Sequence, residues 1–367
     1  MFSQSVNTRL LVRSVGAAFL LTGIAFLYGC SSDSKTNVEP VKRLEGGGAT
    51  FVNPIMQAWS ADRKNKGVIE INYQSNGSGF GITNMTKGTL HFGCSDAPMQ
   101  QSELDAATKM NGEVLHIPTT MAAVAIIYNL EGFTGDLKLD GNVLSAIYLG
   151  KITRWNDPAI TKLNPGAKLP ESEIVPVYRA ESSGTTFIFT DYLSKAAPST
   201  FGAEIGANKL PAWPKVGLGQ KGNGGIAGHV TRNPNCIGYV ELSYAKESKL
   251  PTASLINRKG KAVQPTPEAV SAAAEAAMSL PQTGNYALHK LTYALTDVDA
   301  DAAYPICGMS FAVLYKKQPA EILTPLRDFL KWATTEGQAF APELHYAPLP
   351  APLQKAIGAR LDEMVAE

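Results

Sequence analysis

The sequence predicts an α/β protein, and two observations support this fold class. Short apolar runs, each the length of a buried strand, alternate along the chain with longer segments of helical spacing. The chain is also 367 residues long, which is enough for more than one sizeable hydrophobic core. With 44% hydrophobic and 18% charged residues, it has the composition of an ordinary globular protein.

The strands and helices can be placed in chain order from this alternation. The expected strands span residues 69–73, 122–128, 174–178, 237–242 and 309–315. The expected helices span residues 52–64, 79–87, 102–110, 142–148, 185–195, 267–279 and 320–335. Glycine- and proline-rich segments at 164–170 and 217–228 predict surface loops.

The N-terminus predicts an export signal over residues 1–29. Arg9 and Arg13 precede the uncharged, mostly apolar run 14–29, which is short for a membrane span but typical of a signal peptide. The run ends in Leu-Tyr-Gly-Cys, which resembles a bacterial lipobox, so we expect Cys30 to be lipidated and to begin the mature chain. The alternative is an ordinary cleaved signal followed by a chance cysteine.

Residues 30–43 are polar and offer almost nothing to bury, so they predict a flexible tether. The protein would then be a membrane-anchored lipoprotein, periplasmic or at the cell surface.

Charge excludes a nucleic-acid partner. The 33 basic and 32 acidic residues give a formal net charge of +1, without the basic excess that nucleic-acid binding requires. An anion bound by this chain would therefore be held by local geometry and not by a broad positive field.

Three cysteines lie beyond Cys30, and their spacing fits no zinc site. In an oxidising compartment one pair could form a disulfide, and Cys236 with Cys307 is then the expected pair because each precedes a strand-like run. The alternative is that these cysteines are buried free thiols. The five histidines are scattered, and we expect no metal site and no cofactor.

Three segments place glycine and hydroxyl residues directly before a helix, at 46–51, 76–79 and 182–185. Serine or threonine can cap such a helix, and glycine allows backbone N–H groups to approach a ligand closely. Helix N-termini with unpaired N–H groups suit an oxyanion. Capped helices are common, however, so each segment alone is also explained by capping.

Two charged residues near these segments favour an anion site. Arg179 ends a predicted strand just before the third segment, where its guanidinium could give paired hydrogen bonds to an anion. Asp96 could accept a hydrogen bond from the P–OH group of phosphate, whereas ionised sulfate offers no proton. Alone, Asp96 is also explained as a turn residue before proline.

Several motifs together resemble the phosphate-specific substrate-binding proteins of ABC transporters. The resemblance runs in order from about Gly46 to about Lys331 and covers nearly all of the mature chain. The motifs are GGGATFVNP, NYQSNGSGFG, FGCSDAP, VYRAESSGTTFIFTDYL, KGNGGIAGHV, NCIGYVELSYA and YPICGMSFAVLY.

The resemblance implies a set of phosphate-binding residues, with backbone and hydroxyl donors at three helix starts. These residues are Thr50, Phe51, Ser78, Asp96, Arg179, Ser183, Gly184 and Thr185. Asp96 would be the proton acceptor that selects phosphate over sulfate, and Arg179 the charged donor. Glu181 stands where the family usually has aspartate, as the residue that braces the guanidinium.

The resemblance also implies a two-lobed fold of the type II periplasmic-binding-protein class, with a mixed sheet flanked by helices in each lobe. One lobe would combine residues 44–118 with 304–367, and the other would span 119–303. The ligand would bind in the cleft between the lobes, and hinge closure would bring the two sets of residues together.

The function implied is binding of inorganic phosphate outside the cytoplasm and its delivery to the permease subunits of an ABC importer, by a monomer that is not an enzyme. Three alternatives remain open from sequence: binding of another protonated oxyanion such as arsenate, phosphate sensing, and phosphoryl hydrolysis on the same fold.

Overall fold

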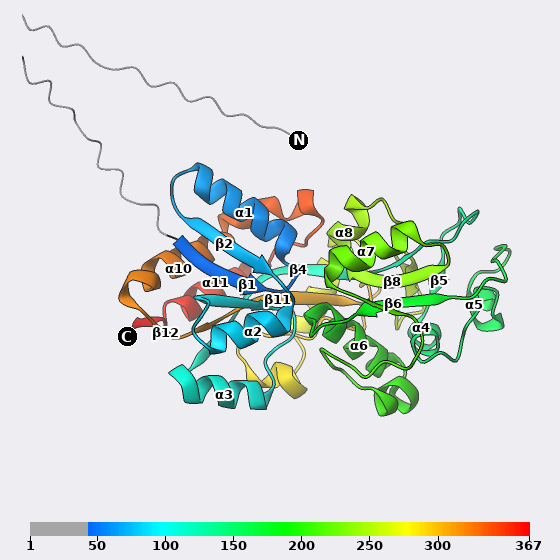
Figure 1. Cartoon of the computed structure of the whole chain (residues 1–367), viewed down its shortest axis with the longest axis horizontal. Helices are drawn as coiled ribbons and strands as arrows, with labels where there is room; N and C mark the ends of the chain where they lie inside the picture. Colours follow the sequence, from blue (N-terminus) through cyan, green and yellow to red (C-terminus); the bar gives the residue numbers. More distant parts are fainter. Residues whose placement is uncertain (1–42) are drawn as a thin grey trace, which may run out of the picture. The chain divides into compact units, whose positions relative to one another are not determined.

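The computed structural model describes residues 43–367, which form an α/β unit with helices on both faces of a mixed sheet (Figure 1). This confirms the predicted fold class. The expected signal peptide at 1–29, the lipidation site Cys30 and nearly all of the expected tether lie outside the described residues.

The main sheet has eight strands in the order β2-β1-β3-β11-β4-β8-β6-β7. Their bounds are β1 (Arg43–Gly48), β2 (Glu70–Ser75), β3 (Phe92–Ser95), β4 (Val114–Tyr128), β6 (Val175–Arg179), β7 (Leu218–Gln220), β8 (Cys236–Glu241) and β11 (Cys307–Tyr315). Small sheets are formed by β5 (Lys138–Leu139), β9 (Ser254–Ile256) and β10 (Ala262–Val263), and by β12 (Lys317–Gln318) and β13 (Val365–Ala366).

The long strand β4 joins two halves of this sheet. Its residues up to Ala123 pair with β11, and its residues from Val124 onward pair with β8, both antiparallel. We call β2, β1, β3 and β11 with their helices the β1 half, and β8, β6 and β7 with theirs the β8 half. In Figure 1 the β1 half carries the blue, cyan and orange elements, and the β8 half carries the green ones.

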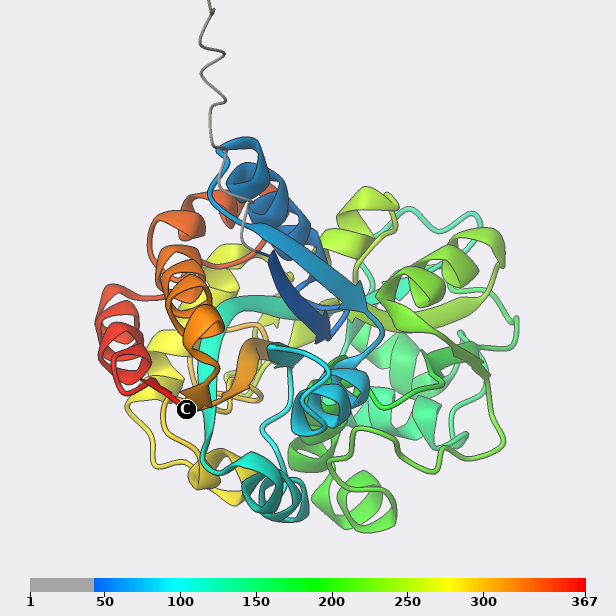
Figure 2. The same cartoon turned by 60° about the vertical axis from the view of Figure 1, so that its left-hand side comes forward.

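Most helices follow a strand and pack against the sheet. They are α1 (Asn53–Asn65), α2 (Ser78–Thr86), α3 (Gln101–Asn111), α4 (Gly141–Tyr148), α5 (Pro158–Leu163), α6 (Gly184–Ala196), α7 (Gly222–Arg232), α8 (Leu242–Glu247), α9 (Pro267–Met278), α10 (Ala320–Ala333) and α11 (Ala351–Leu361). Shorter helical turns are η1 (Pro198–Gly202), η2 (Gly284–Leu288), η3 (Glu336–Phe340) and η4 (Pro342–Leu344). In the turned view of Figure 2, α10 and α11 lie together beside the strands of the β1 half.

The prediction of a surface loop at 217–228 is wrong. Residues 218–220 form β7, and α7 begins at Gly222 despite its glycine content. Packing outweighs the poor helix propensity of glycine here, because Ile226 and Val230 are fully buried against Gly238 of β8. A side chain at Gly238 would lie 2.8 Å from Ile226.

The parallel connections explain where a ligand could be held. Strands β1, β2, β6 and β7 are each followed by a helix that begins within a few residues of the strand end. In open α/β sheets the carboxyl ends of the strands and the helix N-termini that follow them form the ligand-binding edge.

Candidate functional site

Two helix starts from opposite halves of the sheet meet at Ser78. The Ser78 hydroxyl, at the start of α2, accepts a hydrogen bond from the Gly184 N–H (2.9 Å) at the start of α6. It also accepts one from the Asp96 N–H (3.2 Å). Beside it, the Gly79 N–H donates to the Ser182 carbonyl (3.1 Å). The structure therefore brings residues together that lie about one hundred positions apart in sequence.

Gly184 is required for this close approach. An ideal Cβ at this position would lie 2.5 Å from the Ser78 hydroxyl oxygen and 2.6 Å from the Asp96 nitrogen. Any other residue at position 184 would push the two halves apart.

The Arg179 guanidinium is buried and braced by Glu181. Its Nε donates to Glu181 Oε1 (2.8 Å), Nη2 pairs with the same oxygen, and Nη1 donates to the Thr185 hydroxyl (3.4 Å). Glu181 Oε1 also accepts from the Gly222 N–H (2.9 Å), which orients the carboxylate. Glutamate therefore reaches the position at which the related family usually has the shorter aspartate.

A guanidinium has five N–H groups. Three of those on Arg179 are used by Glu181 and Thr185, which leaves one on each terminal nitrogen without a partner among residues 43–367. Two such N–H groups form the fork that binds an oxyanion through paired hydrogen bonds.

Asp96 is a buried carboxyl group in the same site. Only 2% of the surface of Asp96 is exposed, and its Oδ1 accepts a hydrogen bond from the Ser310 hydroxyl on β11 (2.8 Å). Burial raises the pKa of Asp96 to about 7, while the Ser310 hydroxyl and the Arg179 charge oppose that rise. A carboxyl group of this kind can share a proton with a ligand near neutral pH.

Thr50 and Phe51 form the turn between β1 and α1, and two tyrosines hold its carbonyls. The Tyr244 hydroxyl donates to the Thr50 carbonyl (2.7 Å), and the Tyr346 hydroxyl donates to the Phe51 carbonyl (2.6 Å). The Thr50 hydroxyl accepts two hydrogen bonds from Asn223, at 2.8 Å from Nδ2 and 3.2 Å from the backbone N–H. This third helix start is thereby tied to the β8 half.

Ser183 has a more local role. Its hydroxyl caps α6 by accepting from the Thr186 N–H (3.1 Å), and its own N–H donates to the Lys209 carbonyl (2.9 Å). Lys209 in turn forms an ion pair with Glu103 of α3, which is a further polar link between the halves.

Three buried polar residues of the site were not assigned from sequence: Asn223, Glu241 and Ser310. Each lies in a motif that carried the family resemblance, yet the motif gives no sign of what the side chain contacts. The only available signal was their type, because a polar residue inside an apolar or glycine-rich run needs a partner when it is buried.

The prediction of a disulfide between Cys236 and Cys307 is wrong. Both residues are buried and free, as is Cys94. Cys307 pairs with Ala123 on one side of β4, whereas Cys236 lies opposite Asn129 on the other side. Six strand residues span roughly 20 Å, and a disulfide requires Cα atoms within roughly 7 Å.

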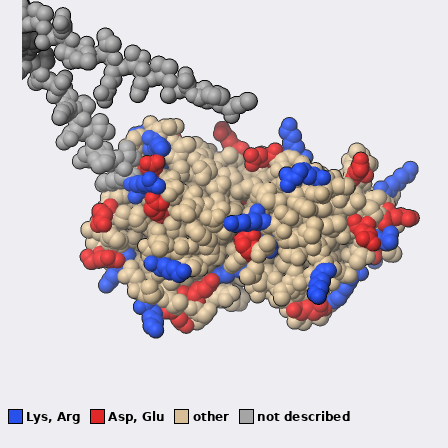
Figure 3. All heavy atoms as spheres, in the orientation of Figure 1, with Lys and Arg blue, Asp and Glu red and all other residues tan. Residues whose placement is uncertain are grey.

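The face of the molecule drawn in Figure 3 shows no broad positive patch. On the face shown in Figure 3, basic and acidic side chains are interspersed. Among residues 43–367 there is no cluster of three or more side chains suited to a metal ion, and no helix long and apolar enough to cross a membrane.

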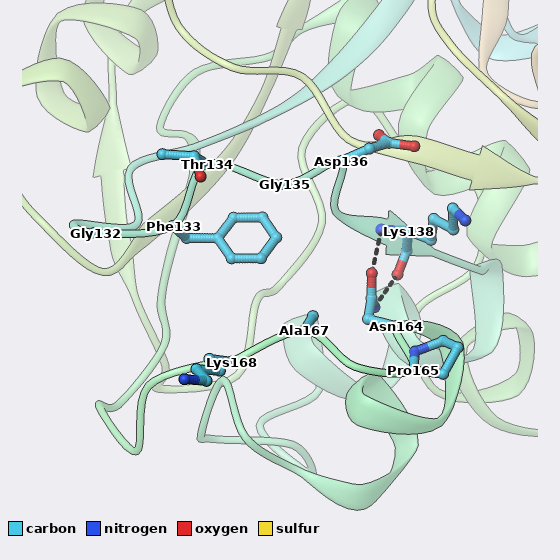
Figure 4. Close-up of a pocket in the computed structure, with 10 residues that line it drawn as sticks. All are labelled: Gly132, Phe133, Thr134, Gly135, Asp136, Lys138, Asn164, Pro165, Ala167 and Lys168. Atoms are coloured by element: carbon cyan, nitrogen blue, oxygen red, sulfur yellow. Dashed lines mark hydrogen bonds between the residues drawn. The ribbon is translucent and has the colours of Figure 1, made fainter.

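A surface cavity at the far end of the β8 half shares no residue with the site. Figure 4 shows its lining, from the loop that precedes β5 and the residues that follow α5. The Asn164 side chain joins these segments through two hydrogen bonds to the backbone of Lys138, both 2.8 Å. The cavity is therefore separate from the groups described above.

Comparison with known proteins places the chain in a family. A model of the PBP superfamily domain matches residues 33–336. The phosphate-binding protein PstS of Pasteurella multocida (strain Pm70) is 40% identical over 319 residues, which cover 86% of this chain and 89% of the relative. The PstS of Xylella fastidiosa (strain 9a5c) is 38% identical over 340 residues, which cover 90% of each chain.

The chain belongs to the PstS family. Members of this family are substrate-binding proteins of transport systems. Solved structures agree on the fold: a phosphate-binding protein from Stenotrophomonas maltophilia has a TM-score of 0.65 at 20% identity and covers 87% of this chain and 94% of its own. A DING protein has a TM-score of 0.69 at 21% identity, with 86% and 93% covered.

Proposed function

We propose that this PstS family member binds inorganic phosphate outside the cytoplasm and delivers it to the permease of an ABC-type importer. The relatives named above are phosphate-binding proteins. The observation that carries the proposal is the pairing of one buried fork of N–H donors, on Arg179, with one buried carboxyl group whose pKa is near 7, on Asp96.

This pair distinguishes phosphate from sulfate by hydrogen-bond chemistry. Near pH 7 phosphate carries a proton that the Asp96 carboxylate can accept, and its remaining oxygens accept from Arg179 and the helix starts. Sulfate carries no proton, so the same carboxylate would repel it. Arsenate is protonated like phosphate, so this argument predicts that arsenate binds as well.

The proposed ligand set is the one implied by the family resemblance. It comprises Thr50, Phe51, Ser78, Asp96, Arg179, Ser183, Gly184 and Thr185, with Glu181 in support. Hydrogen bonds connect both sides of this set, from Ser78 to Gly184 and, through Asn223, from Thr50 to Thr185.

We further propose that residues 44–118 with 304–367 form one lobe, that 119–303 form the other, and that phosphate closes them. A ligand that bonds to both lobes at once favours the closed state by its differential affinity. Small-angle scattering of ligand-free protein should show compaction when phosphate is added, and an unchanged radius of gyration would contradict closure.

Lipidation of Cys30, attachment to a membrane and a monomeric state are also proposals. The lipobox-like run before Cys30 supports the first two. Mass spectrometry of the N-terminal peptide should show a lipid on Cys30, and Cys30→Ser should release the protein from the membrane fraction. Light scattering should give the mass of one chain, and co-purification should recover the permease.

We propose that the protein is not an enzyme. A sensitive phosphatase assay tests this, with Arg179→Ala as the control that distinguishes activity of this site from a contaminant. Hydrolysis that disappears in the variant would overturn the proposal.

Calorimetric titration tests phosphate binding directly. The purified protein is unfolded and refolded to remove carried-over ligand, and is then titrated with phosphate, sulfate and arsenate. We expect one-to-one phosphate binding, no heat with sulfate, and sharply weaker binding in Asp96→Asn and Arg179→Ala. No phosphate heat from a demonstrably folded sample would overturn the proposed function.

A further inference from the structure

The hydroxyl groups of the site are restricted in the direction of their hydrogen bonds. A serine or threonine hydroxyl has one proton to donate and two lone pairs with which to accept. The Thr50 oxygen accepts from both the backbone N–H and the side-chain Nδ2 of Asn223, at 3.2 and 2.8 Å. With both lone pairs occupied by N–H groups, the Thr50 hydroxyl can only donate.

The hydroxyl oxygens at the other two helix starts also accept two hydrogen bonds each. The Thr185 oxygen accepts from Asn223 Nδ2 (3.3 Å) and from Arg179 Nη1 (3.4 Å). The Ser78 oxygen accepts from the N–H groups of Asp96 and Gly184, at 3.2 and 2.9 Å. All three hydroxyls are buried, and each has its own proton left to give, with the Asp96 carboxyl as a nearby acceptor for those of Ser78 and Thr185.

Asn223 fixes two of these three directions with one amide group. Its Nδ2 has two N–H groups, one for Thr50 and one for Thr185. Its Oδ1 accepts from the backbone N–H of Glu241 (3.1 Å). The opposite amide orientation would place an NH₂ group against that backbone donor, so the Glu241 N–H determines which end of the amide faces the hydroxyls.

Asn223 is fully buried and links the two halves of the sheet, because Thr50 belongs to the β1 half and Thr185 to the β8 half. Its place at the second residue of α7 keeps it between β8 and the turn of Thr50 and Phe51. Its contact with Thr50 therefore forms only where the two halves have come together, whereas its contact with Thr185 lies within the β8 half.

We propose that Asn223 is a positioning residue that turns the Thr50 and Thr185 hydroxyls into obligatory donors to the bound anion. The proposal rests on the proposed function, since it assigns the polarity of the same site. In this arrangement the hydroxyls and the guanidinium offer donors only, and Asp96 supplies the acceptor. A ligand that accepts through most of its oxygens and donates one proton matches that set.

Asn223→Asp is the sharpest test because it keeps the size of the side chain and the acceptor for the Glu241 N–H while replacing the Nδ2 donor with an acceptor. The new carboxylate would attract the hydroxyl protons away from the ligand and add a buried negative charge. Calorimetry should show phosphate affinity lower by about a hundredfold or more, since bonds to charged groups are among the strongest.

Asn223→Ala serves as the matched variant, because it removes the donors without reversing the hydroxyls. We expect a smaller loss, about tenfold. The ratio of wild-type to Asn223→Asp affinity should shrink as pH falls and the new carboxyl is protonated, whereas the ratio for Asn223→Ala should stay constant. A merely structural role for Asn223 would not produce this difference in pH profile.

A double-mutant cycle with Thr50→Val keeps the test decisive if Asn223→Asp fails to fold. If Asn223 acts through the Thr50 hydroxyl, Asn223→Ala should cost less affinity in the Thr50→Val background than in wild type. Strictly additive losses would overturn the inference, as would an Asn223→Asp protein that binds phosphate within about threefold of wild type. Absence of phosphate binding by folded wild-type protein would instead overturn the proposed function.

Discussion

Both halves present hydroxyl and backbone groups to the site, but the Asp96 carboxyl comes from the β1 half, whereas the guanidinium of Arg179 and the amide of Asn223 come from the β8 half. The acid and the cation thus come from opposite halves, each buried where the halves touch. Neither half alone holds both the proton acceptor and the charged donor. The selectivity proposed above is therefore a property of the closed arrangement and not of either half.

Removing the cation of the β8 half should have the largest effect. Arg179→Ala should weaken phosphate binding by at least about a hundredfold, because it removes the paired N–H donors and leaves Glu181 without its partner. Calorimetry measures the loss. Arg179→Lys is the informative control: a point charge without the fork should restore only a small part of the affinity, and full recovery would contradict the role given to the paired N–H groups.

The second-largest loss of phosphate affinity is expected when one added methyl group separates the halves. Gly184→Ala places a Cβ 2.5 Å from the Ser78 hydroxyl oxygen, so phosphate affinity should fall by tens of fold, about 2 kcal/mol. Titration measures this, and circular dichroism checks the fold.

Gly358→Ala is the matched control for that prediction. Gly358 lies in α11 with open space around its Cβ position. Because alanine favours helix, this variant should be slightly more stable and should bind phosphate normally. Equal losses in both variants would show that close contact of the halves is not what Gly184 provides.

The stability of the folded protein should depend on pH through Glu241. This carboxyl is fully buried, and burial raises its pKa from 4.5 to about 8. Between these two values the unfolded chain loses the proton while the folded protein keeps it, so this group's contribution to stability falls as pH rises and levels off above about 8. Melting temperatures should follow that trend by a few degrees.

Glu241→Gln should flatten this dependence, since glutamine is neutral at every pH. Thermal melts of ligand-free protein between pH 5 and 9 would measure it. An unchanged slope in the variant would mean that other groups cause the pH dependence.

The smallest effect is expected at the ion pair of Lys209 with Glu103, which joins the halves away from the ligand groups. Lys209→Met should weaken phosphate binding about twofold to fivefold, because water reaches the partly exposed Glu103 carboxylate and screens its pairing with the buried Lys209. Lys151→Met is the control, as its pair with Glu204 lies on the surface within the β8 half. An equal loss of affinity in the control would show that the Lys209–Glu103 pair does not specifically stabilise the closed arrangement.

The sequence predicted the fold class and most of the longer helices because those segments carry clear apolar periodicity, but it missed α7, α11 and the first half of β4. Strands β1 and β3 were missed, since glycines in Gly46–Gly48 and at Gly93 show no strand preference. Their reason is tertiary: a Cβ at Gly46 would lie 2.3 Å from the Phe92 ring. No local pattern can reveal a contact between residues so far apart.

The candidate site also contains residues that the sequence predicted and a residue that it did not. Arg179 was found because a guanidinium beside a helix start has a recognisable chemistry, and Asp96 because protonated phosphate needs an acceptor and the family resemblance supplied its role. Asn223 was not, because its role depends on three partners, Thr50, Thr185 and the Glu241 backbone, that meet only in the folded chain. Sequence identified the groups proposed to touch the ligand better than the group that orients them.

The place of β11 in the sheet has a consequence for how the chain is made. Strand β3 (residues 92–95) and the first part of β4 both pair with β11, whose residues are 307–315. During synthesis β3 and the first part of β4 remain without this partner until well over a hundred further residues have been made, so the β1 half cannot finish folding before nearly the whole polypeptide has left the ribosome. Such late pairing suits the export proposed above, because a chain whose sheet is still incomplete can cross a membrane as an extended polymer.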